Sequence, residues 1–156
     1  MGANTYRLMS GFAVQPHPLD ENNADVDDSL TELTNASKVV FSSTLDSPLS
    51  WSNSELVRGD AVEEVRAMKR DGTSAMRTIG SISLCRSFLE AGLVDRFRVV
   101  VFPVITGKTG SERIYDNYPD VALKMLASRT FQGGIQLLEF APTVLDGAPR
   151  AGSQTE

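Results

Sequence analysis

Apolar runs of strand length alternate along this chain with segments of helical spacing, and this alternation constrains the fold most strongly. The run Lys38–Ser42 is β-branched and aromatic, and Val99–Phe102 is the most apolar run in the chain. Between them, Asp60 precedes a predicted helix that extends to about Arg70, and a second helix is predicted to end at Gly92. Strands that alternate with helices are typical of an α/β domain built on a mostly parallel sheet.

Further strand signals complete the predicted sheet. Leu56–Arg58 and Met76–Ile79 are predicted as short strands, and Val99–Val101 as part of a strand buried on both faces in the middle of the sheet. Near the end of the chain, residues 121–131 and 134–140 are predicted as long antiparallel strands joined by a glycine-rich turn. The sheet is therefore expected to end in an antiparallel hairpin.

Two helical segments are predicted before the first strand. Thr5–Phe12 has the spacing of a short helix with Tyr6, Met9 and Phe12 directed inward. In the long polar segment that follows, Asp28–Leu33 is predicted to form about two helical turns, because its acidic first turn suits the helix dipole.

Composition excludes several classes of function. The net charge is −5 and the basic residues are scattered, whereas nucleic-acid binding needs clusters of Lys and Arg. No stretch approaches the roughly 18 consecutive apolar residues of a membrane span, and the first residues show no secretory signal. Cys85 is the single cysteine, so no internal disulfide can form. We therefore expect a cytoplasmic protein that binds neither nucleic acid nor membrane.

The sequence shows no motif for metal binding or covalent catalysis. His17 is the single histidine and has no cysteine or carboxylate pair close to it. Gly107–Gly110 is similar to the end of a phosphate loop, but Phe102 stands where the first glycine of that loop is required. We expect no metal site, and no catalytic residue can be assigned.

The segment most suggestive of ligand binding is the predicted passage from strand to helix at Gly80. The first turn of that helix contains Ser81, Ile82 and Ser83. Free N–H groups at a helix start, together with the helix dipole, favour an anion there, and a glycine allows a phosphate to approach the backbone. A plain turn in which Ser81 is an ordinary helix cap explains the pattern equally well.

Two further segments are weaker candidates for ligand binding. Gly2 precedes a predicted helix start that contains Asn4 and Thr5. Ser42 and Ser43 follow the first predicted strand, at the edge of the sheet where ligands of open α/β folds collect. From the residues alone, a hydroxyl-rich loop is the favoured interpretation of these two serines.

Together these segments resemble the dihydrofolate reductase-like reductases, in particular the branch related to the riboflavin-biosynthesis reductase domain. The resemblance rests on the order and spacing of Gly2-Ala3-Asn4-Thr5-Tyr6, Lys38–Leu45, Ile79-Gly80-Ser81, Leu89–Asp95, Phe102–Gly107 and the closing hairpin. It implies a three-layer α/β fold whose mostly parallel mixed sheet ends in a C-terminal antiparallel hairpin. We expect residues 1–142 to form this domain and residues 143–156 to form a flexible tail.

The resemblance assigns the three candidate segments to one ligand, NADPH. It implies that the pyrophosphate is held by Gly80, Ser81, Ile82 and Ser83, that Gly2, Asn4 and Thr5 contact the phosphates, and that Ser42 and Ser43 lie near the adenosine end. Relatives often have an arginine after the first glycine, where it pairs with the 2′-phosphate of the cofactor. Ala3 stands at that position here, so NADH is an alternative cofactor.

The activity implied by the resemblance is hydride transfer from NADPH to a small pterin-like or ribosylaminopyrimidine-like substrate. Members of the family usually have two strands and a loop before the first helix, and this sequence begins after them. We therefore expect an N-terminally incomplete domain that forms a homodimer, because pairing with a second copy covers an exposed strand edge. The alternative is a non-catalytic nucleotide-binding or dimerisation module, which would bind nucleotide or itself without oxidising NADPH.

Overall fold

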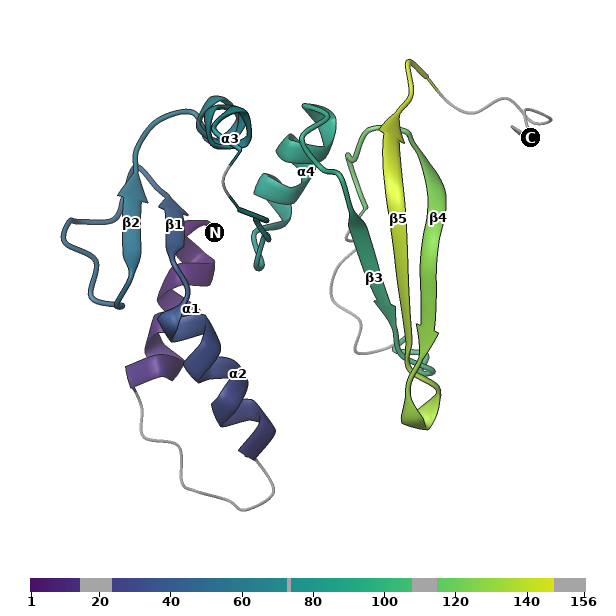
Figure 1. Cartoon of the computed structure of the whole chain (residues 1–156), viewed down its shortest axis with the longest axis horizontal. Coiled ribbons are helices and arrows are strands. Elements are labelled where there is room, and N and C mark those ends of the chain that lie inside the picture. Colours follow the sequence, from purple (N-terminus) through teal and green to yellow (C-terminus); the bar gives the residue numbers. More distant parts are fainter. Residues whose placement is uncertain (15–23, 73, 108–114, 148–156) are drawn as a thin grey trace. The chain divides into compact units, whose positions relative to one another are not determined.

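The computed structural model of the chain (Figure 1) describes residues 1–14, 24–72, 74–107 and 115–147. The chain divides into two compact units, Met1–Cys85 and Arg86–Glu156, and each is described by itself. The first unit contains helices and a parallel strand pair, and the second contains a three-stranded antiparallel sheet. The α/β class predicted from the sequence is confirmed. Among the helices of the described residues, none is long and apolar enough to cross a membrane.

A parallel pair of strands, β1 (Lys38–Phe41) and β2 (Ser54–Val57), forms the sheet of the first unit. The beginning of the chain also pairs with β1, because the N–H of Phe41 donates to the carbonyl of Met1 at 2.9 Å. Gly2 forms an isolated parallel bridge with Phe41, and Figure 1 shows the N-terminus beside β1. The first residues are thus fixed next to the carboxyl end of β1.

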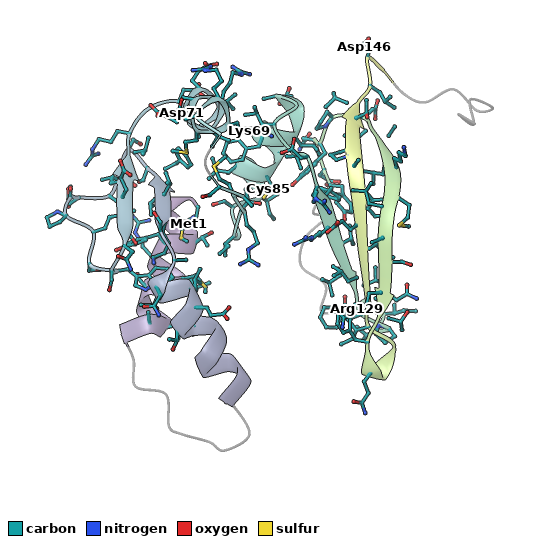
Figure 2. All side chains as sticks on the ribbon, in the orientation of Figure 1. Met1, Lys69, Asp71, Cys85, Arg129 and Asp146 are labelled. Carbon is teal, nitrogen blue, oxygen red and sulfur yellow. The ribbon has the colours of Figure 1, made fainter. Side chains whose placement is uncertain are left out.

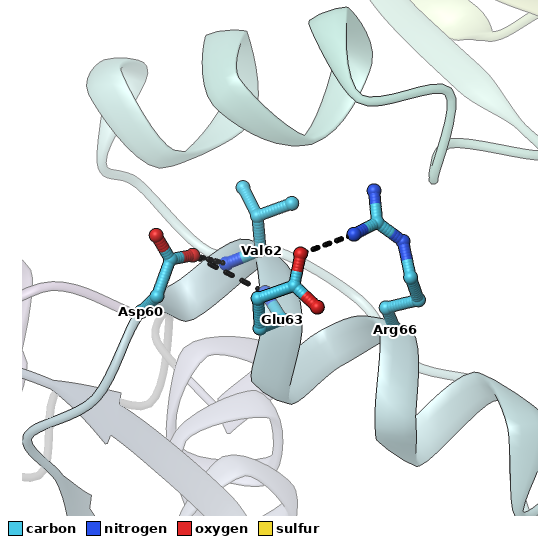
Figure 3. A network of polar contacts seen from close by, with 4 residues as sticks. All are labelled: Asp60, Val62, Glu63 and Arg66. Carbon is cyan, nitrogen blue, oxygen red and sulfur yellow. Dashed lines mark hydrogen bonds and ion pairs between the residues drawn. The ribbon is translucent and has the colours of Figure 1, made fainter.

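The described residues form four α-helices in chain order: α1 (Ala3–Val14), α2 (Ala24–Asn35), α3 (Ala61–Arg70) and α4 (Ile82–Glu90), the last of which crosses the boundary between the two units. All four confirm helices predicted from the sequence, although α1 and α2 are longer than expected. Asp60 caps α3 as predicted, since its Oδ1 accepts the N–H groups of Val62 at 2.8 Å and Glu63 at 3.2 Å (Figure 3). Glu63 in turn pairs with Arg66 on the next turn.

The predicted strand Met76–Ile79 is wrong. Residues 74–79 have no regular secondary structure, and the side chain of Met76 is 50% exposed. Only Met76 and Ile79 in this run are apolar, so pairing would bury little apolar surface. The segment instead leads as an irregular connection into α4.

The core of the first unit is the cluster Tyr6, Val40 and Trp51, of which Val40 is fully buried. The hydroxyl of Tyr6 accepts the backbone N–H of Trp51 at 3.0 Å, and the indole N–H of Trp51 donates to Thr34 Oγ1 at 3.1 Å. These bonds satisfy the polar atoms of two large aromatic side chains in the core. Phe12, which was predicted to point inward, is 43% exposed, so that prediction is wrong.

The side chain of Lys38 caps the C-terminal end of α2 by binding backbone carbonyls there. Its side chain is buried, and Nζ donates to the carbonyls of Leu33, Thr34 and Ala36 at 2.7–2.9 Å. The ammonium also lies 4.7 Å from the centre of the Trp51 ring. Burial lowers the pKa of Lys38, while the three carbonyls at the negative end of the helix favour its charged form.

The second unit is a sheet in the order β3–β5–β4, formed by β3 (Phe97–Val101), β4 (Val121–Thr130) and β5 (Gln136–Val144). The turn Gln132–Gly134 joins β4 to β5, which confirms the predicted hairpin (Figure 1). β5 extends two residues beyond position 142, where the domain was predicted to end. Most of the predicted tail, from residue 148, lies outside the described residues.

The prediction that Val99–Val101 is buried on both faces is wrong. Within its sheet β3 is an edge strand that pairs with β5 alone. Val100 and Val101 are 51% and 43% exposed, and Val99 is half-buried. A continuous apolar run is typical of a central strand, but here it belongs to a short strand at one edge of an antiparallel sheet.

A charged cluster crosses this sheet at Glu139 of β5. Arg98 of β3 is the register partner of Glu139, and its Nε donates to the carboxylate at 2.5 Å, while Arg96 pairs with the other carboxylate oxygen. The hydrogen bond from Arg98, followed by that from Arg96, holds the pKa of Glu139 below its usual value against the opposing effect of burial.

Replacing Glu139 with Gln should reduce the loss of folding stability that occurs when the pH is lowered. A carboxyl whose pKa is lowered on folding contributes stability above its ordinary pKa of about 4.3, and this contribution is lost as the pH falls through the lowered value. Thermal melting between neutral pH and pH 3 should therefore show a shallower decline for Glu139→Gln than for the natural chain.

The matched control is Glu63→Gln, which removes an exposed pair with Arg66 on α3. Exposed pairs of this spacing contribute about 0.3–0.5 kcal/mol, so the control should leave the profile almost unchanged. Identical profiles for Glu139→Gln and the natural chain would show that the cluster does not couple protonation to stability.

Candidate functional site

Two helix starts meet beside the carboxyl end of β1. The N–H of Gly2, just before α1, donates to Ser81 Oγ, just before α4, at 2.8 Å, although the two residues are 79 positions apart. Thr5 Oγ1 lies 3.4 Å from the same Ser81 oxygen. We call Gly2, Thr5, Gly80 and Ser81 the helix-start junction.

The backbone of the junction is left-handed at two successive residues. Gly80 has φ +58°, which glycine adopts freely, and Ser81 has φ +55°, which is uncommon for a residue with a side chain. Such a conformation costs about 1–3 kcal/mol and persists when its surroundings enforce it. Ser81 is held by three hydrogen bonds: its hydroxyl bonds to the N–H of Gly2 and to the hydroxyl of Thr5, and its carbonyl accepts the N–H of Cys85.

The glycines of the junction have a packing role that the sequence did not reveal. A Cβ at Gly80 would lie 2.5 Å from Thr5 Oγ1 and 2.8 Å from Thr5 Cγ2. A Cβ at Gly2 would lie 2.5 Å from Ser81 Oγ. The absence of a side chain at these positions therefore allows the two helix starts to touch.

The junction brings together the positive ends of two helix dipoles and the first-turn N–H groups of both helices. The first intrahelical bonds begin at Tyr6 in α1 and at Cys85 in α4, so the N–H groups of the preceding turn have no intrahelical acceptor. Neither helix has an acidic residue in its first turn, and the side chains of Asn4 and Ser83 are exposed. An anion is the ligand that this arrangement fits.

Cys85 lies at the end of the first turn of α4, and Figure 2 labels it. Its Sγ is 3.5 Å from both Thr78 Oγ1 and the carbonyl of Gly80, with which it forms weak hydrogen bonds. The side chain is half-buried. Cys85 thus helps to fix the irregular connection that leads into the junction.

The loop after β1, residues 42–45, forms the second part of the site. Ser42 Oγ accepts the N–H groups of Thr44 at 3.0 Å and Leu45 at 3.1 Å, so its hydroxyl shapes the loop. The side chain of Ser43 is exposed, and its carbonyl accepts a hydrogen bond from Arg58 at 3.2 Å. Of the two predicted serines, Ser43 is exposed and Ser42 is half-buried.

Two arginines that the sequence analysis did not single out also belong to the site. Arg7 Nη1 donates to Asn4 Oδ1 at 3.3 Å, and its Nη2 donates to Thr44 Oγ1 at 3.5 Å. Arg58 directly follows β2, and its Nη2 donates to the carbonyl of Leu45 at 2.7 Å. One signal was available, because Arg7 lies three residues after Asn4 and therefore on the same face of a helix.

The structure thus brings the predicted site residues into two neighbouring groups. Gly2, Thr5, Gly80 and Ser81 touch at the junction, Asn4, Ile82 and Ser83 lie on the first turns of the two helices, and Ser42 and Ser43 lie in the loop after β1. Arg7 links the groups by bonding to both Asn4 and Thr44. In the part of the chain that is described, no three His, Cys, Asp or Glu residues form a metal-binding group.

A separate open depression of about 420 Å³ lies near the amino ends of β1 and β2. Its lining consists of Asn35, Ser37, Leu49, Trp51, Ser52, Asn53, Ser54 and Glu55. Hydroxyls, amides and one carboxylate do not suit an anionic cofactor. None of the predicted site residues lies there. We therefore take the junction, and not this depression, as the candidate site for an anion.

The chain has a dihydrofolate reductase-like α/β fold, and comparison with known proteins identifies the family. The model of the RibD C-terminal domain family matches residues 5–137. The chain therefore belongs to the RibD C-terminal domain family, and the resemblance inferred from the sequence is confirmed.

One curated relative matches part of the chain. The chain is 33% identical over 79 residues to the uncharacterized protein YyaP of Bacillus subtilis, an alignment that covers 51% of this chain and 42% of that protein. The chain thus matches less than half the length of this relative.

Solved structures support the same fold. A protein from Shewanella sp. PV-4 that is assigned by name to riboflavin biosynthesis superposes with a TM-score of 0.66 at 17% identity, covering 92% of this chain and 72% of that one. A pyrimidine reductase-like protein from Corynebacterium diphtheriae gives a TM-score of 0.55 at 14% identity, with coverages of 91% and 74%. At these identities the two structures show a shared fold.

Replacing Gly80 with Ala should destabilise the first unit by more than its backbone conformation alone explains. The left-handed φ costs an alanine about 1–3 kcal/mol, and the new Cβ would also collide with Thr5. Gly92→Ala is the matched control, because Gly92 has φ +66° and no atom within 4 Å of an added Cβ. Denaturant melts should show the larger loss for Gly80→Ala.

A double variant separates the two contributions. Adding Thr5→Ala to Gly80→Ala removes the colliding Oγ1 and Cγ2 atoms and should recover part of the lost stability. Equal losses for Gly80→Ala and Gly92→Ala, with no recovery in the double variant, would show that the two helix starts are not packed as described.

Proposed function

We propose that this chain binds NADPH and uses it to reduce a small heterocyclic substrate of the pterin-like or ribosylaminopyrimidine-like class. The observation that carries the proposal is the helix-start junction, which brings the positive ends of two helix dipoles together beside the carboxyl end of β1. Ligands of open α/β folds bind at that edge, and a pyrophosphate is the anion that such helix starts hold.

The residues of the two helix starts would hold the pyrophosphate by backbone and hydroxyl donors. The N–H groups of the first turns of α1 and α4 have no intrahelical acceptor, and the exposed hydroxyl of Ser83 adds a donor. Thr5 and Ser81 bond each other, so their part is to fix the separation of the two helices. The exposed Ser43 would face the adenosine end. When bound, NADPH supplies the hydride that reduces the substrate.

The proposed substrate class is supported by the family of the chain and by the name of one structural neighbour. It belongs to the RibD C-terminal domain family, and one neighbour is named as pyrimidine reductase-like. We assign no proton donor and no catalytic residue. Formation of a homodimer and a cytoplasmic location stay predictions from the sequence.

The second candidate function is a nucleotide-binding module without catalysis. It shares the helix-start junction with the reductase and differs only in turnover. Single-turnover mixing with a pterin or a ribosylaminopyrimidine distinguishes them, because only the reductase should convert bound NADPH to NADP⁺. Tight binding of NADPH without oxidation in the presence of either substrate would favour the module.

A charge placed at the start of α4 tests the binding site directly. Glutamate in the first turn suits the helix dipole, so Ser83→Glu should keep the fold. The same charge repels a pyrophosphate, so the affinity for NADPH should fall at least about tenfold, or about 1.4 kcal/mol. Titration by NADPH fluorescence or calorimetry measures the change.

The matched control is Ser52→Glu, which adds the same charge at an exposed position that lines the depression near the amino ends of β1 and β2. This variant should bind NADPH as the natural chain does. If Ser52→Glu weakens binding and Ser83→Glu does not, the cofactor binds at the depression and the proposed site is wrong.

A further inference from the structure

The outer edge of β3 has no strand partner among the described residues. β3 pairs with β5 on one side, and its other side forms no ladder with any described strand (Figure 1). An edge strand presents a row of unpaired N–H and C=O groups, which is a template for pairing with a further strand. The backbone of β3 can therefore accept one more strand.

The two edges of this sheet differ in how they are protected against such pairing. β4, at the opposite edge, has a register shift directly after Met125 and exposed charges at Lys124 and Arg129, and bulges and charges of this kind discourage pairing. β3 keeps an unbroken register with β5 along its whole length. Its one charged side chain, Arg98, is already paired with Glu139. Of the two edges, only that of β3 is suited to receive a strand.

Exposed apolar side chains gather along the β3 edge. Phe102, Val104 and Ile105, which follow β3 directly, are 57%, 65% and 97% exposed. With Val100 and Val101, they make five of the six residues from 100 to 105 large exposed hydrophobics. A contiguous apolar patch of this kind marks an interaction site in a soluble protein. The partner that fits the edge is therefore an apolar strand.

A second copy of β3 fits this edge in one antiparallel register, with the two-fold axis at Val99. The residues directly opposed across the axis are then Val99 and Val99, Phe97 and Val101, and Arg98 and Val100. An axis at Arg98 would oppose two like charges, and an axis at Val100 would bring Pro103, which donates no backbone hydrogen bond, into the ladder. Only the register at Val99 pairs the whole strand without such a conflict.

We propose that the chain forms a symmetric dimer through the outer edge of β3, with the two-fold axis at Val99. The two three-stranded sheets then join into one continuous sheet. Arg98, whose charge Glu139 neutralises, lies against Val100 of the second copy. The proposal assigns the homodimer predicted from the sequence to one strand and one register, and it does not depend on the proposed function.

Sedimentation velocity on the full chain tests the dimer itself. A single strand pair with a few apolar side chains is a small interface, typical of weak complexes. The natural chain should therefore show a reversible equilibrium of monomer and dimer between about 1 and 200 μM. A natural chain that stays monomeric over this range overturns the proposal.

Two variants that differ only in the sign of one charge test the register. Val100 is about half exposed, so a charged side chain there can reach solvent in the single chain. Val100→Lys places a like charge opposite Arg98 of the second copy, whereas Val100→Glu places an opposite charge there. The Glu variant should dimerise at least about tenfold more tightly than the Lys variant, and added salt should reduce the difference. Equal weakening by both variants overturns the register.

The matched control is Leu123→Lys, because Leu123 is an apolar residue of β4 that is 43% exposed at the opposite edge of the sheet. This variant should dimerise as the natural chain does. Circular dichroism and thermal melting establish that each variant is folded. If Leu123→Lys breaks the dimer and Val100→Lys does not, the contact lies at β4 and the proposal is wrong.

A cysteine at the axis gives a second measurement that adds no charge to the sheet. Opposed residues of antiparallel strands have Cα atoms about 4.5–5.5 Å apart, a distance that a disulfide spans. Val99→Cys should therefore form a cross-linked dimer under mild oxidation. Val100→Cys should not, because its two copies would lie about 8 Å apart across the axis. The natural chain, with Cys85 alone, gives the background, and cross-linking of Val100→Cys but not of Val99→Cys overturns the register.

Discussion

The hydrogen bond from Gly2 to the hydroxyl of Ser81 is the interaction on which the site depends. It joins two parts of the chain that are 79 residues apart and brings the start of α1 against the start of α4. It also supports the left-handed backbone of Ser81, which is uncommon for a residue with a side chain. Without it, each helix start would present its dipole separately.

The distribution of charges around this bond explains how an acidic chain can hold an anionic cofactor. The net charge of −5 repels an anion at long range, but the first turns of α1 and α4 contain no acidic residue. Backbone N–H groups and helix dipoles provide the positive potential where the pyrophosphate is expected. Arg7 and Arg58 provide it at the loop after β1, where they bond to neutral oxygens.

Features set by local chemistry were predictable from the sequence. Asp60 caps α3, and the glycine-rich turn between β4 and β5 forms the hairpin, because both signals lie within a few residues of the structure they determine. The family resemblance then assigned Gly2, Thr5 and Ser81 to one ligand, and the structure brings these residues into contact. That ligand assignment itself stays a prediction.

Features set by distant neighbours were not predictable. Met76–Ile79 has the composition of a strand but gains no partner strand in the described residues, and Val100 is in an apolar run that forms an edge strand. The roles of Gly80 and Arg58 also depend on other elements, since Gly80 makes room for Thr5 and Arg58 bonds to the loop after β1. A single sequence shows the residue types but not which segments will meet.

Amide chemical-shift mapping by NMR during titration with NADPH tests the central claim most directly, because it locates the cofactor without altering any residue. The account predicts that the perturbed amides concentrate at residues 2–5, 42–45 and 81–84, which comprise the helix-start junction and the loop after β1. Perturbations confined to residues 51–55 at the open depression, or to the hairpin of β4 and β5, would contradict it.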